Sequence, residues 1–210
     1  RAGCIFHNYT CDWNLDHKIL SNKCMKLARL TYFVLFVFYS MSSFAEKSFF
    51  KDISNLLPDQ KPRLSYGVAV TDFDNDGSDE FIVTGFGYEN LALGYDGNSL
   101  KNKIKENIFS DFNRSTIGVA ACDIDKDGHE EIYFLNTDTY SGQKMYSDRL
   151  LKLVDKNIED LFEKDINQDE LNLTAGRSVV CVDREGKGNY GIYVANYGGP
   201  TRFYEYIEDR

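Results

Sequence analysis

Short apolar runs alternate with acidic, glycine-containing loops between residues 64 and 210. These runs are rich in Val, Ile, Phe and Tyr and are bounded by Gly and Asp, which is typical of strands and not of helices. They cover residues 67–71, 81–84, 90–95, 118–122, 132–135, 150–154, 178–182, 192–195 and 202–207. Only Asp160–Glu170 favours a short helix, and it is too polar to predict a core element.

The runs form a repeat in three copies. Each copy has an apolar run, an acidic loop that begins with an aspartate, and a second apolar run. The loops begin at Asp72, Asp123 and Asp183, so the offsets are 51 and 60 residues. Repeats of this length are typical of propeller blades or other arrays. We therefore predict an all-β fold, an incomplete β-propeller of about three blades around residues 64–100, 115–160 and 175–210, each with the content of a four-stranded sheet.

The first two loops have the pattern of a calcium site. Carboxylates at positions one, three, five and nine supply the oxygen ligands that calcium prefers, and a glycine at position six allows a sharp turn. The predicted ligands of the first loop are Asp72, Asp74, Asp76, the Ser78 carbonyl and Glu80, and those of the second are Asp123, Asp125, Asp127, the His129 carbonyl and Glu131. The predicted cofactor is Ca2+.

Two other kinds of loop share part of this pattern. An EF-hand loop closes with a glutamate at position twelve between two helices, but that position holds Val83 in one loop and Phe134 in the other. The second alternative is a solvated acidic turn without metal, since Asp, Asn and Gly are common in turns. Against it, clustered carboxylates without a counter-ion repel one another. Imidazole suits transition metals, so we expect the His129 side chain to face solvent.

The third loop keeps the length and the position-six glycine but loses the charge pattern. Lys187 stands where the third carboxylate should be, and Gly191 where the last should be. We predict a degenerate site in which the Lys187 ammonium takes the place of the cation and pairs with Asp183 and Glu185.

The first 45 residues have the pattern of a leader. Met25 is followed by Lys26 and Arg29, then by the apolar run Leu30–Tyr39, and Ser43-Phe44-Ala45 supplies small residues for cleavage. This predicts a secretory signal peptide at residues 25–45, with residues 1–24 as an upstream non-structural segment. A membrane anchor is the alternative, but the run is shorter than the roughly 20 residues that a spanning helix needs.

Charge and cysteines fit an extracellular protein. The chain has a net charge of −9, and residues 46–210 have 19 basic and 31 acidic side chains, which argues against a nucleic-acid partner. Cys122 and Cys181 are a candidate disulfide pair in an oxidising compartment, although the sequence does not show that they are close. Asn113 and Asn172 each begin a glycosylation sequon.

Motifs of catalysis are not seen. The sequence has no Gly-x-Ser-x-Gly elbow, His-Glu-x-x-His helix or phosphate-binding glycine loop. We therefore predict no catalytic residues and no enzymatic activity.

The block Gly-Val-Ala-x-x-Asp-x-Asp-x-Asp-Gly-x-x-Glu followed by an apolar strand resembles the FG-GAP repeat of integrin α propellers. Residues 66–85, 117–136 and 175–197 resemble the N-terminal propeller of the cartilage acidic protein family. This resemblance implies a secreted, calcium-binding matrix glycoprotein with a seven-bladed propeller. It further implies that the chain is an N-terminal part of a longer protein. In the repeat, Cys122 and Cys181 fall just before their loops on adjacent blades, so in a secreted protein they are candidates for a bridge.

The expected function is a non-enzymatic adhesion or extracellular-matrix interaction module with an extracellular protein or matrix partner and no membrane span. The alternative is a propeller attached to a secreted enzyme, as in phospholipases that carry FG-GAP repeats.

Overall fold

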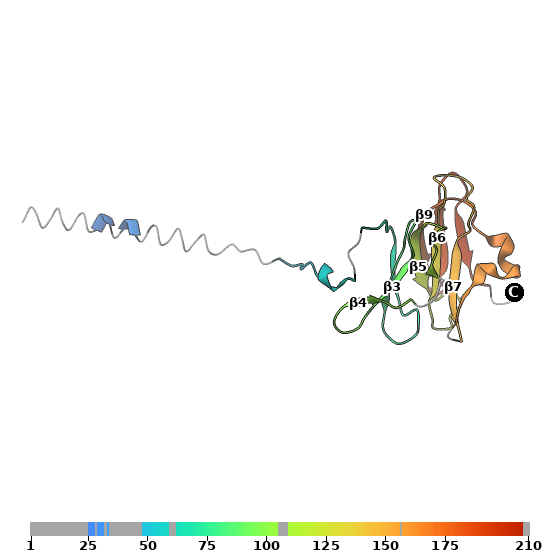
Figure 1. Cartoon of the computed structure of the whole chain (residues 1–210), viewed down its shortest axis with the longest axis horizontal. Coiled ribbons are helices and arrows are strands. Elements are labelled where there is room, and N and C mark those ends of the chain that lie inside the picture. The colour runs from blue at the N-terminus through green and yellow to red at the C-terminus, as the bar shows by residue number, and fades with distance from the viewer. Residues whose placement is uncertain are drawn as a thin grey trace, which may run out of the picture. The chain divides into compact units, whose positions relative to one another are not determined.

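The computed structural model describes residues 25–27, 29–31, 33, 48–58, 62–104, 109–155 and 157–207 (Figure 1). The chain divides into two units, residues 1–52 and 53–210. In the first unit, residues 25–27, 29–31 and 33 are helical. Among the described residues no helix has the length and apolar character needed to cross a membrane. The predicted segment 1–24 and the cleavage site after Ala45 lie outside the described residues.

The second unit consists of three antiparallel sheets whose strands are adjacent in sequence order. The first sheet contains β1 (Val68–Thr71), β2 (Glu80–Val83), β3 (Leu91–Tyr95) and β4 (Leu100–Asn102). The second contains β5 (Thr116–Cys122), β6 (Glu131–Asn136), β7 (Arg149–Val154) and β8 (Asn157–Asp160). The third contains β9 (Gly176–Val182), β10 (Gly191–Asn196) and β11 (Arg202–Glu205). The predicted all-β class is confirmed, and the sheets have the strand order of propeller blades.

Three short 3-10 helices complete the described elements: η1 (Ser54–Leu56), η3 (Leu161–Glu163) and η4 (Asp165–Glu170). The last two occupy the segment in which the sequence favours a helix. Asp160 caps η3 by accepting a hydrogen bond from the Phe162 backbone N–H, and the Phe162 side chain is buried. The segment therefore contributes one core residue, which its polar composition does not predict.

The second sheet is buried on both faces. Along β6, side chains point alternately to the two sides. Ile132 and Phe134 pack with Ile82 of the first sheet, whereas Tyr133 and Leu135 pack in a second cluster that includes Ile192 and Val194 of the third sheet. This explains why residues 132–135 of β6 form a continuous apolar run, since every residue of this strand is buried.

The innermost strands β1, β5 and β9 lie side by side, one from each sheet. Glycines make their close approach possible. A Cβ atom on Gly67 would lie 3.0 Å from the Gly118 Cα, and a Cβ on Gly176 would overlap the side chain of Leu135. These glycines precede or begin the inner strands, which gives a physical reason for their presence at the start of each repeat.

We expect Gly176→Ala to lower the free energy of unfolding by about 1–3 kcal/mol, because the added methyl group overpacks the fully buried Leu135. Denaturant unfolding measures the change. Ser178→Ala, at an exposed position of the same strand, is the control and should stay within about 0.5 kcal/mol of the wild type. Equal stabilities for Gly176→Ala and wild type would contradict the packing argument.

Candidate metal centre

The three acidic loops occupy the same place in their sheets. Each connects the first strand to the second: β1 to β2, β5 to β6, and β9 to β10. Each loop also has left-handed backbone at its fourth and sixth positions. The φ angles are 56° at Asn75 and 87° at Gly77 in the first loop, 64° at Lys126 and 90° at Gly128 in the second, and 66° at Gly186 and 76° at Gly188 in the third. The loops therefore share one backbone conformation, which only glycine and a few polar residues adopt readily.

The first aspartate of each loop stabilises this turn. Asp72 accepts hydrogen bonds from the backbone N–H groups of Asp76 and Gly77, both at 2.9 Å. Asp123 accepts one from Gly128 at 3.0 Å, and Asp183 accepts one from Gly188 at 2.6 Å. The hydrogen bond from Gly188 is the main cause that lowers the pKa of Asp183. The turn thus forms in all three loops, whether or not the other carboxylates are present.

In the first loop, Asp72, Asp74 and Glu80 offer carboxylate oxygens that lie within 4.8 Å of one another. Glu80 begins β2 and is completely buried, and neither of its carboxylate oxygens has a hydrogen-bond partner among the described residues. Among the described residues, its ion-pair partner is Lys103, whose Nζ lies 3.8 Å from Oε1. A buried carboxylate without hydrogen bonds is costly unless a cation compensates it.

The ionisation of Glu80 reflects this environment. Burial is the main cause that raises its pKa from 4.5 to about 7, and the negative charge of Asp74 adds to the shift. A divalent ion among these oxygens would provide the missing counter-charge, so the donor set fits calcium.

Asp76 lies apart from this cluster. Its Oδ2 is 3.2 Å from the Lys103 Nζ, and its Oδ1 accepts a hydrogen bond from the Ser78 backbone N–H. The hydrogen bond from Lys103 is the main cause that lowers its pKa. The structure therefore brings together three of the four predicted carboxylates of the first loop, and metal coordination by Asp76 and the Ser78 carbonyl stays a prediction.

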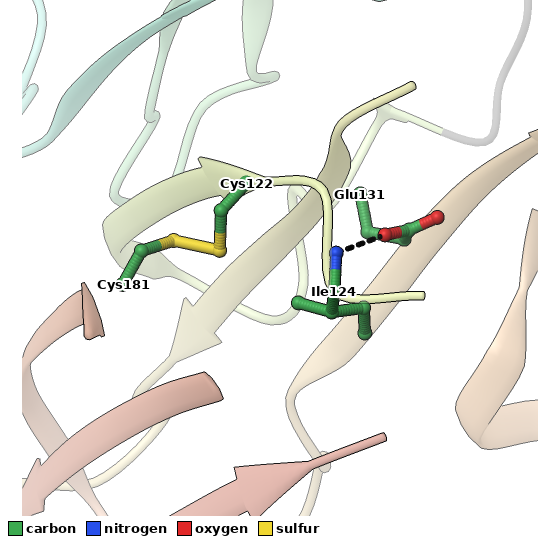
Figure 2. The surroundings of a disulfide bond; sticks show 4 residues. All are labelled: Cys122, Ile124, Glu131 and Cys181. Carbon is green, nitrogen blue, oxygen red and sulfur yellow. Dashed lines mark hydrogen bonds between the residues drawn. A yellow bond between two sulfur atoms is a disulfide. The ribbon is translucent and has the colours of Figure 1, made fainter. Parts of the chain in front are cut away.

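In the second loop, Asp123, Asp125 and Asp127 lie within 4.8 Å of one another. The buried Glu131 is held differently from Glu80, because its Oε2 accepts a hydrogen bond from the Ile124 backbone N–H at 2.9 Å (Figure 2). The His129 backbone N–H donates to Asp127, and a ligand role for the His129 carbonyl stays a prediction.

Lys152 of β7 places its ammonium group among these carboxylates. Its Nζ contacts Asp125, lies 2.6 Å from Asp127 and lies 3.0 Å from Glu131. The hydrogen bond from Lys152 is the main cause that lowers the pKa of Asp127. Burial alone would lower the pKa of Lys152, but these three hydrogen bonds outweigh it and raise that pKa. No local sequence pattern points to Lys152, which is 21 residues from Glu131; only the strand register brings the two together.

The third loop has internal ion pairs. Lys187 pairs with Glu185 at 2.8 Å, whereas Asp183 accepts backbone hydrogen bonds. Of the two partners predicted for Lys187, the structure brings Glu185 to it, and Lys187 itself is exposed. Glu205 of β11 lies opposite Gly191 and pairs with Arg184. Among the described residues, no metal-type cluster of acidic side chains forms in this loop.

A disulfide between Cys122 and Cys181 connects β5 to β9 (Figure 2). Cys122 immediately precedes Asp123, and Cys181 lies two residues before Asp183. The cross-link therefore joins the second and third sheets at the base of their acidic loops.

The two sequons differ in accessibility. Asn113 is exposed in a turn, and its glycosylation stays a prediction. Asn172 is completely buried, and its Nδ2, the atom that would carry a glycan, donates hydrogen bonds to Asp148 and Asn196. Glycosylation at Asn172 also stays a prediction, and the structure disfavours it, since in the folded chain a glycan there would break a buried hydrogen-bond network.

Comparison with known proteins agrees with this geometry. A family model described as an FG-GAP-like repeat matches residues 72–134, from the first aspartate of the first loop to β6. Cartilage acidic protein 1 of Mus musculus is 45% identical over an alignment that covers 73% of this chain and 26% of that protein. This chain is a homologue of the cartilage acidic proteins.

The human cartilage acidic protein 1 is 44% identical, with 73% of this chain and 25% of that protein covered. Cartilage acidic protein 1 of Xenopus tropicalis is 45% identical, and the alignment covers 64% of this chain and 23% of that protein. The chain therefore spans about a quarter of the length of the curated relatives that it matches.

We expect the free energy of unfolding of the chelator-treated chain to depend on pH through Glu80. Since its pKa is raised from 4.5 to about 7, the folded state binds the proton more tightly. The contribution of Glu80 is therefore fully present below about pH 4.5 and decreases as the pH rises to about 7, by up to about 3 kcal/mol.

Chemical denaturation at several pH values, compared between wild type and Glu80→Gln, isolates this contribution. Asp79→Asn, which removes a neighbouring exposed carboxylate, is the control and should keep the wild-type slope. Identical pH profiles for wild type and Glu80→Gln would contradict the expectation.

Replacing both Cys122 and Cys181 by Ala should lower the free energy of unfolding by about 2–4 kcal/mol, because the disulfide closes a loop of 59 residues. Denaturant unfolding measures the loss. A reducing agent should weaken the wild-type chain by a similar amount and leave the double variant unchanged. If a reducing agent lowered the stability of both proteins equally, the disulfide would not be the source of the lost stability.

Proposed function

We propose that this chain is a calcium-binding propeller segment of a secreted protein, and that it serves as a non-enzymatic interaction module of the extracellular matrix. The observation that carries the calcium assignment is Glu80, a completely buried carboxylate without a hydrogen-bond partner, adjacent to Asp72 and Asp74. The homology to cartilage acidic proteins supports the matrix setting.

Asp72, Asp74 and Glu80 would hold the ion, with Asp76 and the Ser78 carbonyl as further donors. When bound, calcium supplies positive charge and fixed coordination to the end of the first hairpin. The chain's own residues position the donors: Asp72 maintains the turn, and the register of β1 with β2 buries Glu80 opposite Thr71. The ion would thus hold the two strands in register and make the loop rigid for a partner.

Other buried side chains with shifted pKa values favour a structural role over a catalytic one. The pKa of Asp148 is raised and that of Lys144 is lowered, in both cases mainly by burial. The two side chains pair with each other, and the Tyr133 hydroxyl donates to Asp148 at 2.7 Å. All three residues are buried, so a substrate in solvent does not reach them. They are better suited to join the second sheet to its neighbour than to catalyse a reaction.

Thermal unfolding of the full chain with and without calcium tests this function. A ligand that binds only the folded state stabilises it by about 2.7 kcal/mol at 100 times its Kd, which should raise Tm by about 5–10 °C in a domain of this size. Glu80→Gln should remove most of the increase, whereas Asp79→Asn should retain it. A Tm that does not change with calcium would overturn the metal assignment.

A further inference from the structure

We propose that Lys152 is a built-in cation of the second acidic loop, so that the chain binds calcium at the first loop and holds the second loop closed with its own ammonium group. The inference rests on the proposed calcium function and assigns it to one of the two loops. It concerns side chains that lie outside both acidic motifs.

The contacts of Lys152 reach three of the four carboxylates of the second loop; the fourth, Asp123, keeps one buried oxygen without a hydrogen-bond partner among the described residues. An ammonium group has three hydrogen-bond donors, and the Lys152 Nζ contacts three carboxylates: Asp125, Asp127 and Glu131. Only 16% of its side-chain surface is exposed, and Glu131 is buried. The remaining oxygen of Glu131 accepts from the Ile124 N–H, so this buried carboxylate is compensated at both of its oxygens.

The first loop lacks this arrangement. In the register of the first sheet, Glu80 lies opposite Gly94 of β3. In the second sheet, Ile132 pairs with Leu151, so the next residue, Lys152, holds the position that corresponds to Gly94. Because Gly94 has no side chain, Lys103 crosses above it, with its Cε 2.5 Å from where a Cβ would be. Lys103 then pairs with Asp76 at 3.2 Å and stays 3.8 Å from Glu80.

Asp72, Asp74 and Glu80 are thus left as an acidic cluster. The salt bridges of the described residues include none to Asp72 or Asp74, and both oxygens of the buried Glu80 are without a hydrogen bond. A buried acidic group aimed into a cluster of carboxylates is the arrangement that a divalent cation satisfies. The buried glutamate of the first loop therefore depends on an external ion, whereas the buried Glu131 of the second loop is already compensated by Lys152 and the Ile124 N–H.

The third loop shows a different arrangement at the same register position. Gly191 replaces the buried glutamate, and Glu205 lies opposite to it. Arg184, the second residue of the loop, pairs with Glu205 through its Nε and, at 3.1 Å, its Nη2. The residues opposite the ninth loop position are therefore Gly94, Lys152 and Glu205, and this cross-strand residue determines which cation a loop receives.

Displacing Lys152 is costly for an incoming ion. Calcium at the second loop would break three charge-assisted hydrogen bonds, and each is expected to weaken binding by roughly tenfold. The second loop should therefore bind calcium about 1000-fold more weakly than the same loop without the lysine.

Isothermal titration of the chelator-treated full chain with calcium chloride tests the proposal. Wild type should bind one ion per chain, and Lys152→Met, which retains the length of the side chain without the charge, should bind two. Glu80→Gln should bind none, and the combination of Glu80→Gln with Lys152→Met should bind one. Lys126→Asn is the matched control: it removes a positive charge from the same loop at an exposed position, introduces the residue found at Asn75, and should still bind one ion.

Two ions in wild type, or one ion in both wild type and Lys152→Met, would overturn the proposal while leaving calcium binding intact. Binding of no ion by wild type and by Lys152→Met would instead overturn the proposed function. If Lys152→Met does not fold by circular dichroism, wild type and Asp123→Asn decide: an unchanged single ion in Asp123→Asn supports the assignment to the first loop, and loss of that ion overturns it.

Discussion

A carboxylate buried beneath a tight loop is the constraint on which the acidic end of these sheets depends. Glu80 and Glu131 both begin a second strand, and both are buried. Since removing a charge from water costs several kcal/mol, each requires compensation by nearby groups. The second sheet provides this with Lys152 and a backbone N–H; the first sheet provides only Lys103, at 3.8 Å and without a hydrogen bond to Glu80. Two loops of nearly the same sequence therefore present different electrostatic environments.

The other end of the second sheet is also held by buried polar groups, but here they are fully paired. Lys144 donates to the Asn136 carbonyl and to Asp148, and Asp148 accepts from Tyr133 and from the Asn136 backbone N–H. Asn172 and Asn196 join this network through a reciprocal amide pair at 3.0 and 2.9 Å. Buried networks of this kind stabilise a fold when every member is satisfied. The contrast with Glu80, whose oxygens accept no hydrogen bond from the described residues, marks the first loop as the place where an external ligand contributes.

Much of the fold follows from local sequence. The apolar runs and the glycine and aspartate positions predict the strands, the loops between them and the repeat, because these signals depend on neighbouring residues. The strands β4 and β8 were not predicted, because their sequences are short and polar. The burial of Phe162 and Asn172 was not predicted either, since it depends on packing between distant segments. Lys103, Lys152 and Arg184 were missed for the same reason. A lysine in an apolar strand such as β7 carries no local signal of its partner, and only the pairing of β6 with β7 places it opposite Glu131.

The apolar side chains on the outer faces of the first and third sheets have a consequence for cooperativity. Val68 and Val70 of β1 are exposed on one side, and Val180, Tyr193 and Phe203 are exposed on the other. The second sheet, by contrast, packs against a neighbour on each face. Each sheet therefore acts as a unit whose stability increases with the number of its neighbours, as in other repeat proteins. Opening of the structure should begin at an outer sheet and reach the second sheet last, so that slow hydrogen exchange would be concentrated in β6.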